Sequence, residues 1–388
     1  SEVMDPTSIT TNTENTSCSG TIQISLSSSN FSSCIKMTAS SPYTSDNVTF
    51  TVDPYDNLTN DTTYKVRVTT GVKDPAGNPM SSDNTTGTGW TSDGTAPSAP
   101  IVSGTTPTQD TTPTWSWSSG GGGNGTYRYK LDDSDLTSET QNTNTSYTPG
   151  SGISEASHIL YVQERDAAGN WSSSGSRTIV IDNTAPTVTL TDDHSDLRVK
   201  DADNVVITAT FNDNMTSAPT ISIDVAVGTD ADISATAMSG SGTTWTYTFD
   251  VPSGHDGNAT VTVAGTDVAG NAYAGSDTIV YIIDNTAPNV TLTDDHSDLK
   301  VKDADNVVIT ATFDESMTSA PTISIDVAVG TDADISATAM SGSGTTWTYT
   351  FDVPSGHDGN ATVTVAGTDV AGNAYAGSDT IVYIIDNT

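Results

Sequence analysis

Residues 204–211 read Asn-Val-Val-Ile-Thr-Ala-Thr-Phe, and apolar side chains stand at every second position of this stretch. A period of two is typical of a β-strand that buries one face and exposes the other. The predicted inner face consists of Val205, Ile207, Ala209 and Phe211, and the outer face of Val206, Thr208 and Thr210. Similar alternation recurs at 221–227 (which ends on Val227), 245–249, 259–263 and 279–283. These stretches, separated by turn-forming residues, predict an antiparallel β-sandwich.

This stretch belongs to a unit that occurs twice. Asp-Asn-Thr-Ala-Pro begins at Asp182 and again 102 residues later at Asp284, and Asp-Asn-Thr returns after a further 102 residues at Asp386. A unit near 100 residues is too long for a solenoid repeat and has the size of one β-sandwich domain. The copies 184–286 and 286–388 differ at five pairs of positions: Thr187/Asn289, Arg198/Lys300, Asn212/Asp314, Asp213/Glu315 and Asn214/Ser316.

The first half of the chain follows the same pattern with a different sequence. Alternating stretches that predict strands contain Val48, Phe50 and Val52, then Tyr64, Val66 and Val68, then Trp115 and Trp117, and then Ile159, Tyr161 and Gln163. We predict an all-β chain of tandem immunoglobulin-like β-sandwiches arranged end to end. The predicted domains are 1–92, 93–183, 184–285 and 286–388.

Acidic residues dominate the charge. The chain carries 48 Asp and Glu against 12 Lys and Arg, a formal net charge of −36. Only six of these acids are Glu and 42 are Asp, which favours turns and is a hard oxygen ligand. Such a surface repels nucleic acid and anionic lipid and attracts divalent cations. We therefore expect no nucleic-acid partner. No apolar run reaches ~18 residues, so we also expect no membrane insertion in this segment.

The chain has two cysteines, Cys18 and Cys34, both in the predicted first domain. Two cysteines that flank an alternating stretch favour one disulfide in an oxidising compartment. In the chain-entropy model a loop of this length contributes roughly 3 kcal/mol. The alternative is a pair of buried free thiols.

Asp-x-Ala-Gly-Asn begins at Asp166, Asp267 and Asp369, and a strand and then Asp-Asn-Thr follow each time. These motifs resemble the bacterial Ig-like domain repeats of large secreted surface adhesins. The stretch 48–80, with Asp-Pro-Ala-Gly-Asn from Asp74, is similar to the Ig-like domain of surface-layer and related envelope proteins. The resemblance implies an extracellular location at the cell surface. It also implies calcium, bound by acidic residues at domain junctions, that stiffens a rod.

In an immunoglobulin-like topology the chain enters a sandwich at one end and leaves it at the other, so acidic loops of neighbouring domains meet at the linker. Like charges this close repel unless an ion neutralises them, and calcium accepts six to eight oxygen ligands in loose geometry. The alternative is a solvated surface on which each Asp of an Asp-x-x-Gly-Asn loop only caps a turn. The predicted calcium ligands are Asp284, Asp314, Glu315 and Asp369 at one linker, and Asp182, Asp213 and Asp267 at the preceding one.

The sequence contains no recognisable catalytic motif: it lacks Gly-x-Ser-x-Gly, His-Glu-x-x-His and a dinucleotide fingerprint. We therefore predict a protein that is not an enzyme but a structural or adhesive rod, with further Ig-like repeats of the same polypeptide as partners. One alternative is a subunit that self-assembles into an extracellular filament. Another is a module in domain two that binds a glycan or a host protein, for which Trp171 and the Gly-rich stretch 120–125 are the candidates.

Overall fold

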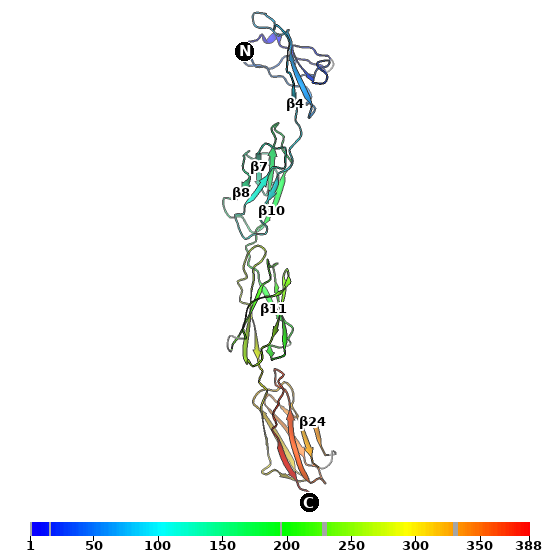
Figure 1. The fold of residues 1–388 in the computed structure, drawn as a ribbon, viewed down its shortest axis with the longest axis vertical. Coiled ribbons are helices and arrows are strands. Elements are labelled where there is room, and N and C mark those ends of the chain that lie inside the picture. Colours follow the sequence, from blue (N-terminus) through cyan, green and yellow to red (C-terminus); the bar gives the residue numbers. More distant parts are fainter. Residues whose placement is uncertain (1, 15–16, 195, 227–230, 329–332) are drawn as a thin grey trace. The chain divides into compact units, whose positions relative to one another are not determined.

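The computed structural model describes residues 2–14, 17–194, 196–226, 231–328 and 333–388 (Figure 1), and Val227 lies outside them. The described regular elements are β-strands and one short 3-10 turn, η1 (Pro6–Ser8); no α-helix occurs among the described residues. The predicted all-β class, with immunoglobulin-like sandwiches in tandem, is confirmed. The chain divides into two compact units, one of residues 1–106 and 110–181 and the other of 107–109 and 182–388.

The second unit begins with a sandwich that we call the first repeated sandwich. Its two sheets have the strand orders β11-β13-β17-β16 and β12-β19-β18-β14-β15. The short strand β12 pairs in parallel with β19, so the beginning of the repeat contributes one strand to each sheet. The strands are β11 (Val188–Asp192), β12 (Arg198–Val199), β13 (Asn204–Phe211), β14 (Thr220–Val225), β15 (Ile233–Ala237), β16 (Ser239–Ser241), β17 (Thr244–Asp250), β18 (Gly257–Ala264) and β19 (Ile279–Ile283).

The second repeated sandwich has the same topology. Its sheets have the orders β20-β22-β26-β25 and β21-β28-β27-β23-β24, with β21 parallel to β28. The strands are β20 (Val290–Asp294), β21 (Lys300–Val301), β22 (Asn306–Phe313), β23 (Thr322–Val327), β24 (Ile335–Ala339), β25 (Ser341–Ser343), β26 (Thr346–Asp352), β27 (Gly359–Ala366) and β28 (Ile381–Ile385).

The predicted inner face of 204–211 is the face that the structure buries. Val205, Ile207 and Ala209 have no exposed surface, and the antiparallel register places Val205 opposite Phe249 of β17. The alternating stretches therefore point one side chain in two toward a shared core between the two sheets. The other sheet contributes Ile221, Ile223, Val225, Ala259, Val261, Tyr281 and Ile283 to this core.

The first unit contains three sheets. In one, β2 pairs with β1, β3 and β4; the other two have the orders β5-β6-β8 and β10-β9-β7. Trp115 and Trp117 of β6 lie in one buried cluster with Leu160 and Val162 of β9. The strands are β1 (Ile22–Leu26), β2 (Thr63–Val68), β3 (Asn84–Thr85), β4 (Trp90–Thr91), β5 (Ile101–Ser103), β6 (Trp115–Ser118), β7 (Thr126–Leu131), β8 (Ser146–Tyr147), β9 (Ser157–Arg165) and β10 (Gly175–Val180).

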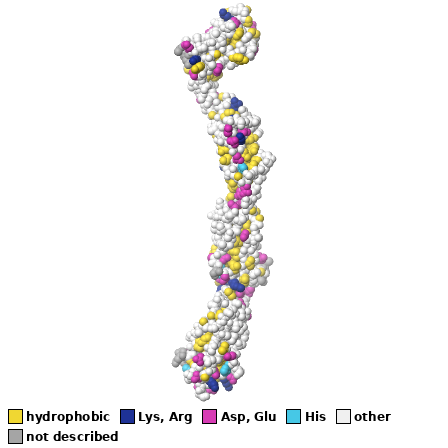
Figure 2. All heavy atoms as spheres, turned by 180° about the vertical axis from the view of Figure 1, so that it is seen from behind, with side chains coloured by type: hydrophobic (Ala, Val, Ile, Leu, Met, Phe, Trp, Pro, Cys, Tyr) yellow, Lys and Arg dark blue, Asp and Glu magenta, His cyan; other side chains and the backbone are white. Residues whose placement is uncertain are grey.

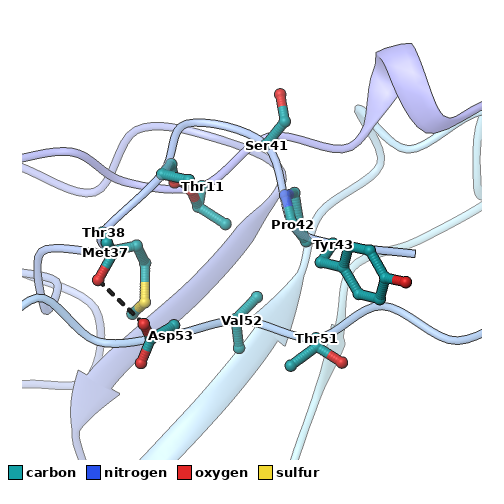
Figure 3. Close-up of a pocket in the computed structure, with 10 residues that line it drawn as sticks. Thr11, Met37, Thr38, Ser41, Pro42, Tyr43, Thr51, Val52 and Asp53 are labelled. Atoms are coloured by element: carbon teal, nitrogen blue, oxygen red, sulfur yellow. Dashed lines mark hydrogen bonds between the residues drawn. The ribbon is translucent and has the colours of Figure 1, made fainter. Parts of the chain in front are cut away.

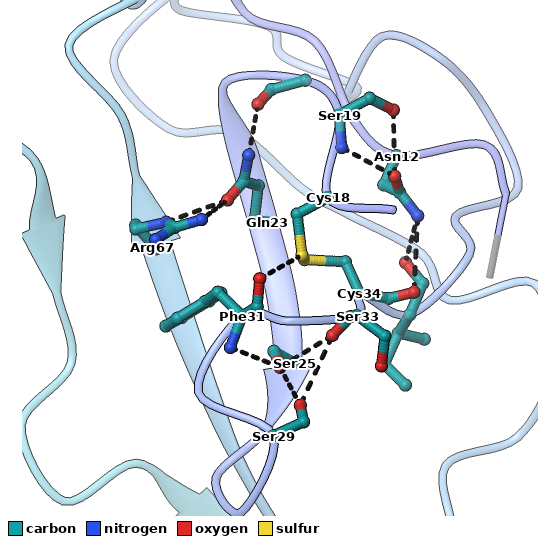
Figure 4. The surroundings of a disulfide bond; sticks show 12 residues. Asn12, Cys18, Ser19, Gln23, Ser25, Ser29, Phe31, Ser33, Cys34 and Arg67 are labelled. Carbon is teal, nitrogen blue, oxygen red and sulfur yellow. Dashed lines mark hydrogen bonds between the residues drawn. A yellow bond between two sulfur atoms is a disulfide. The ribbon is translucent and has the colours of Figure 1, made fainter. Parts of the chain in front are cut away.

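A disulfide joins Cys18 and Cys34 beside β1 (Figure 4). Close to it, the hydroxyl of Ser25 accepts a hydrogen bond from the backbone N–H of Phe31 (3.1 Å) and donates one to the carbonyl of Ser33 (2.9 Å). Residues 27–62, which follow β1, contain no strand. The covalent link and these side-chain hydrogen bonds therefore help to order a segment in which sheet-type pairing is limited to isolated bridges, such as that of Tyr43 with Thr51.

The strand expected at Val48, Phe50 and Val52 does not form, and this prediction is wrong. The carboxylate of Asp46 accepts the backbone N–H groups of Val48 (2.9 Å) and Thr49 (2.7 Å), which turns the chain at the point where the strand was expected to begin. Val48 is 40% exposed, whereas Phe50 is partly buried and Val52 packs against the core cluster of Ile24, Met37 and Tyr64, so the alternation marks a partly buried side of a segment that forms no strand.

The strand containing Ile159 and Tyr161 does form, as β9, but these residues are not its inner face. Its buried residues are His158, Leu160, Val162 and Glu164. Glu164 is buried because its carboxylate accepts the hydroxyl of Ser119 at 2.6 Å. Polar residues with internal partners therefore occupy inner positions of this strand, and the alternation of apolar and polar residues in the sequence does not show which face is buried.

We expect Ile309→Ala to destabilise the second repeated sandwich by about 2–5 kcal/mol, because Ile309 is fully buried and its truncation leaves a cavity. The matched control, Thr312→Ala at an exposed position of the same strand, should cost less than about 1 kcal/mol. Denaturant-dependent hydrogen exchange of the amides in β22 and β26 measures both. Equal losses in the two variants would contradict the assignment of the inner face.

Candidate metal centre

Three carboxylates meet where the second repeated sandwich follows the first. Asp284 comes directly after β19, Glu315 lies in the loop between β22 and β23, and Asp369 lies in the loop between β27 and β28. One oxygen atom from each residue lies within 4.8 Å of the other two. The fold therefore brings together three of the four residues that the sequence predicts as ligands at this linker.

Asp369 is fully buried and is held by its own loop. Its Oδ1 accepts the backbone N–H of Asn373 at 2.8 Å, and its Oδ2 accepts the side-chain amide of Asn373 at 2.9 Å. Gly372 has a φ of +90°, a conformation that favours glycine and closes the turn. Asp369 thus caps a turn, and because each carboxylate oxygen has a further lone pair, this role leaves room for a ligand role.

The same asparagine also holds the linker. The amide of Asn373 donates to the backbone carbonyl of Asp284 at 2.7 Å. Its counterpart Asn271 donates to the carbonyl of Asp182 at 2.9 Å. In the first unit, Asn170 donates to the carbonyl of Asp93 at 3.0 Å. This role of the asparagine was not predicted from the sequence, although Asn recurs four residues after Asp in each of these loops.

The preceding sandwich holds the next residue of the linker. The backbone N–H of Asn285 donates to Oδ1 of Asp256, and the hydroxyl of Thr286 donates to its Oδ2 at 2.7 Å. These hydrogen bonds keep the pKa of Asp256 below its usual range. The amide of Asn285 also donates to the carbonyls of Pro252 (3.0 Å) and His255 (2.7 Å). The linker is thus fixed at residue 285 from one side and at residue 284 from the other.

Two of these carboxylates, Glu315 and Asp284, resist ionisation. Burial raises the pKa of Glu315 to about 7, and the charges of Asp284 and Asp369 add to this shift. Burial also raises the pKa of Asp284, again with a contribution from Asp369. At the equivalent position of the second copy, the pKa of Asp386 is lowered, because the hydroxyl and N–H of Thr388 donate to it.

The other predicted ligands are placed differently. Both oxygens of Asp314 accept hydrogen bonds from Asn289 (2.8 and 2.9 Å), which lower the pKa of Asp314 and keep it out of the convergent group. At the preceding linker, burial raises the pKa of Asp213, and the charges of Asp182 and Asp267 add to the effect. Among the described residues, only the group at Asp284 brings three such ligand atoms within 4.8 Å of one another.

The donor set suits a hard divalent cation. All three groups are carboxylates, and neither Cys nor His belongs to the group, which disfavours the softer transition metals. Three carboxylates offer up to six oxygen atoms, a number compatible with the six to eight oxygen ligands of calcium. Basic side chains are few, with 12 Lys and Arg against 48 Asp and Glu, and Figure 2 shows both kinds on the face that it draws.

A separate hollow of about 420 Å³ lies in the N-terminal part of the first unit (Figure 3). Met37, Val52 and Tyr43 line it, and Tyr43 is 73% exposed.

In domain two, Trp171 has the guanidinium of Arg128 over its ring, 4.2 Å from the centroid. One face of Trp171, a predicted candidate for binding a glycan or a host protein, is therefore already covered.

Comparison with protein families covers most of the chain. The family described as "Bacterial Ig-like domain" matches residues 1–92, and "Bacterial Ig-like domain (group 3)" matches 142–243 and 243–388. This chain belongs to the bacterial Ig-like domains. The matched bacterial Ig-like ranges include the whole acidic group at Asp284, and they confirm the resemblance inferred from the motifs. They run across positions 184 and 286, so the predicted domain boundaries stay a prediction.

Several solved structures show a distant likeness. A tetra-tandem repeat in the extending region of a large adhesion protein is 21% identical, with 95% of this chain and 91% of that chain covered and a TM-score of 0.33. Fibronectin(III)-like modules of Clostridium thermocellum CbhA are 15% identical, with 51% and 95% covered and a TM-score of 0.27. The N-terminal eight Ig domains of Down Syndrome Cell Adhesion Molecule are 10% identical, with 99% and 47% covered and a TM-score of 0.26.

No curated protein matches the chain. In the part of the chain that the structure describes, no helix has the length and apolarity needed to cross a membrane. The family assignment therefore rests on the two family matches and on the topology of the sandwiches.

In chelator, we expect the Glu315 carboxyl to titrate with a midpoint near 7, well above its ordinary pKa of 4.5. Because the folded-state pKa is raised, the stability that this group contributes is fully present below pH 4.5. It is lost as the pH rises through about 7. Carbon-detected NMR of the side-chain carboxyls measures the midpoint, and Glu315→Gln identifies the signal. A midpoint near 4.5 would contradict the burial of this group among like charges.

Proposed function

We propose that this chain is an extracellular structural segment of a bacterial surface protein, in which tandem sandwiches span a distance. We also propose that calcium stabilises the joint between the repeated sandwiches by binding Asp284, Glu315 and Asp369. The observation that carries the proposal is the convergence of these carboxylates within 4.8 Å, from a linker and from the sandwich that follows it. The charges of Asp284 and Asp369 disfavour the ionised form of Glu315, and a divalent cation would remove that repulsion.

A role in providing distance fits the repetition of the chain. Two copies that differ at five positions offer nearly the same side chains twice, and a spacer needs length rather than one unique site. The disulfide between Cys18 and Cys34 fits an oxidising compartment outside the cytoplasm. We therefore propose that the protein is not an enzyme, that it acts at the cell surface, and that its partners are further Ig-like repeats of the same polypeptide.

Calcium would act on the hinge between the two repeated sandwiches. Asp284 would supply the ligand from the linker, and Glu315 and Asp369 would supply ligands from the following sandwich. Because Asn285 and Asp256 already hold the linker to the preceding sandwich, an ion at Asp284 would restrict motion on both sides. The ligands must be ionised to bind, so the affinity should fall as the pH drops below about 7, where Glu315 takes up a proton.

The preceding linker offers a shorter version of the same group. Asp213 stands where the second copy has Glu315, so its carboxylate reaches one methylene less far toward Asp182 and Asp267. The raised pKa of Asp213, caused by burial and by these two charges, supports their proximity. We propose a weaker calcium site at this linker.

Calcium should raise the free energy of unfolding of the second repeated sandwich by about 2.7 kcal/mol at a concentration 100-fold above the Kd, and its unfolding temperature should rise accordingly. Magnesium should stabilise it less, because it requires a tighter octahedral geometry. Glu315→Gln and Asp369→Asn should each abolish most of the gain. The measurement is thermal unfolding of the full chain, followed by NMR signals of this sandwich, in calcium, in magnesium and in chelator.

The matched control is Asp352→Asn. This substitution also removes one acidic charge, but Asp352 is exposed at the end of β26 that pairs with Asn306, where β22 begins, whereas Glu315 follows the other end of β22. The control should keep the full response to calcium. If wild type unfolds at the same temperature in calcium and in chelator, or if Asp352→Asn loses as much as Glu315→Gln, the calcium site is disproved.

A further inference from the structure

Two antiparallel segments in the N-terminal part of the first unit enclose the hollow of about 420 Å³. Two isolated bridges join these segments, Met37 with Pro54 and Tyr43 with Thr51. Between the bridges one segment has five residues, 38–42, and the other has two, 52–53. The longer segment, which we call the arch, must therefore bow away from the shorter one. Figure 3 shows Ser41 and Pro42 of the arch on one side of the hollow and Val52 and Asp53 on the other.

Hydrogen bonds hold the arch in place. The backbone N–H of Thr11 donates to the carbonyl of Ser40 at 2.9 Å, and the hydroxyl of Thr11 donates to the carbonyl of Ala39. Thr11 is only 6% exposed and forms a bridge to β1. At the start of the arch, the backbone N–H of Thr38 donates to the carbonyl of Asp53 at 2.8 Å. The hollow is therefore formed before any ligand arrives, as is usual for binding sites of small molecules.

The hollow combines an apolar floor with a polar rim. Met37 is 2% exposed, and Val52 packs against the buried cluster that contains Met37. Tyr43, 73% exposed, adds an aromatic ring that is open to solvent. Three exposed residues of the rim carry hydroxyl groups and a fourth carries a carboxylate: Thr38, Ser41, Thr51 and Asp53. A hydroxyl both donates and accepts hydrogen bonds, whereas a carboxylate only accepts them.

This combination suits a sugar ring. A pyranose presents C–H groups on its faces, which pack on aromatic and aliphatic side chains, and hydroxyl groups around its edge, which both donate and accept. The volume of about 420 Å³ lies within the range of about 300–1,000 Å³ that is typical of ligand sites. We propose that the hollow under the arch binds a neutral sugar residue of a glycan. The first unit then has a binding function in addition to the structural role proposed above.

The charge of the site selects against an anionic sugar. Asp53 is the one charged side chain among the described residues that line the hollow, and the chain as a whole carries a net charge of −36. Both repel a carboxylated sugar such as a sialic acid.

The backbone of the arch argues against a peptide that would pair with it as an added strand. Such a peptide needs unpaired backbone groups on the segment that it joins. The N–H of Thr38 and the carbonyls of Ala39 and Ser40 already have partners within the chain. Side chains therefore dominate what the hollow offers to a ligand, and these are hydroxyl groups, apolar groups and one acid.

The test uses the full chain in chelator, with ¹³C-labelled methionine methyl groups. A glycan array of neutral and sialylated glycans identifies the glycan that binds best, which is then titrated while NMR follows the methyl signal of Met37. Met215, in the core of the first repeated sandwich, is the internal reference. The variants are Tyr43→Ala and Asp53→Asn. The matched control is Tyr55→Ala, because Tyr55 is 58% exposed but is not among the described residues that line the hollow.

We expect a neutral glycan to shift the signal of Met37 and to leave that of Met215 unchanged. Tyr43→Ala removes the aromatic surface and Asp53→Asn removes the charged acceptor, so each should weaken binding about ten-fold. Tyr55→Ala should bind like wild type. All three substitutions are at exposed positions, and wild-type hydrogen-exchange protection of the amides in β1 and β2 verifies that each variant is folded.

The proposal is overturned if no neutral glycan is retained on the array, if sialylated glycans bind better than neutral ones, or if the bound glycan leaves Met37 unmoved. Equal affinities of Tyr43→Ala and wild type would also overturn it. A shift of Met37 by an oligolysine peptide, with none by a neutral glycan, would assign the hollow to a cationic peptide instead. Because every measurement is made in chelator, these outcomes do not depend on whether calcium binds at Asp284.

Discussion

The amide of Asn373 is the interaction on which the joint between the repeated sandwiches depends. It donates both to the backbone carbonyl of Asp284 and to the carboxylate of Asp369, so one side chain fixes a linker and a buried acid to each other. A buried carboxylate without donors would be strongly destabilising. Hydrogen bonds to a charged group are worth about 1.5–3 kcal/mol each, which offsets the lost hydration. Once the linker and Asp369 are held in this way, Glu315 meets both at short range.

This geometry gives the joint a property that neither sandwich has alone. Asp284 and Asp386 occupy the same position of the repeat, yet the pKa is raised at Asp284, mainly by burial, and lowered at Asp386, where Thr388 donates to the carboxylate. Part of the rise at Asp284 comes from the charge of Asp369 in the following sandwich. Excess negative charge in a partly buried site can be relieved by a proton or by a cation. The choice between them depends on pH and on the cation concentration outside the cell.

The sequence could predict the sandwich because a period of two, which recurs in β13, β14, β18 and β19, is a local property of the chain. It could also place Glu315 and Asp369 near the linker, because loops at one end of an immunoglobulin-like topology follow from strand order alone. The direction of Asp314 could not be predicted, since it depends on the nearby donor Asn289. Likewise, Asn373 reads as a turn residue until the linker carbonyl is known to lie beside it. Where the partners of a residue come from distant segments, a sequence pattern predicts which loops lie close together but not which atoms touch.

Near-identical neighbours present a problem that the joints are well placed to solve. Tandem sandwiches with the same core side chains can exchange strands or assemble in the wrong order while they fold, because the core does not distinguish one copy from the other. Only positions outside the core can do so, and of these only the positions at the linkers meet a different neighbour in each copy. Differences at Asp213 and Glu315, and at Asn212 and Asp314, fall at those positions. The two copies therefore share the core that folds them and differ in the loop that supplies Glu315 to the joint.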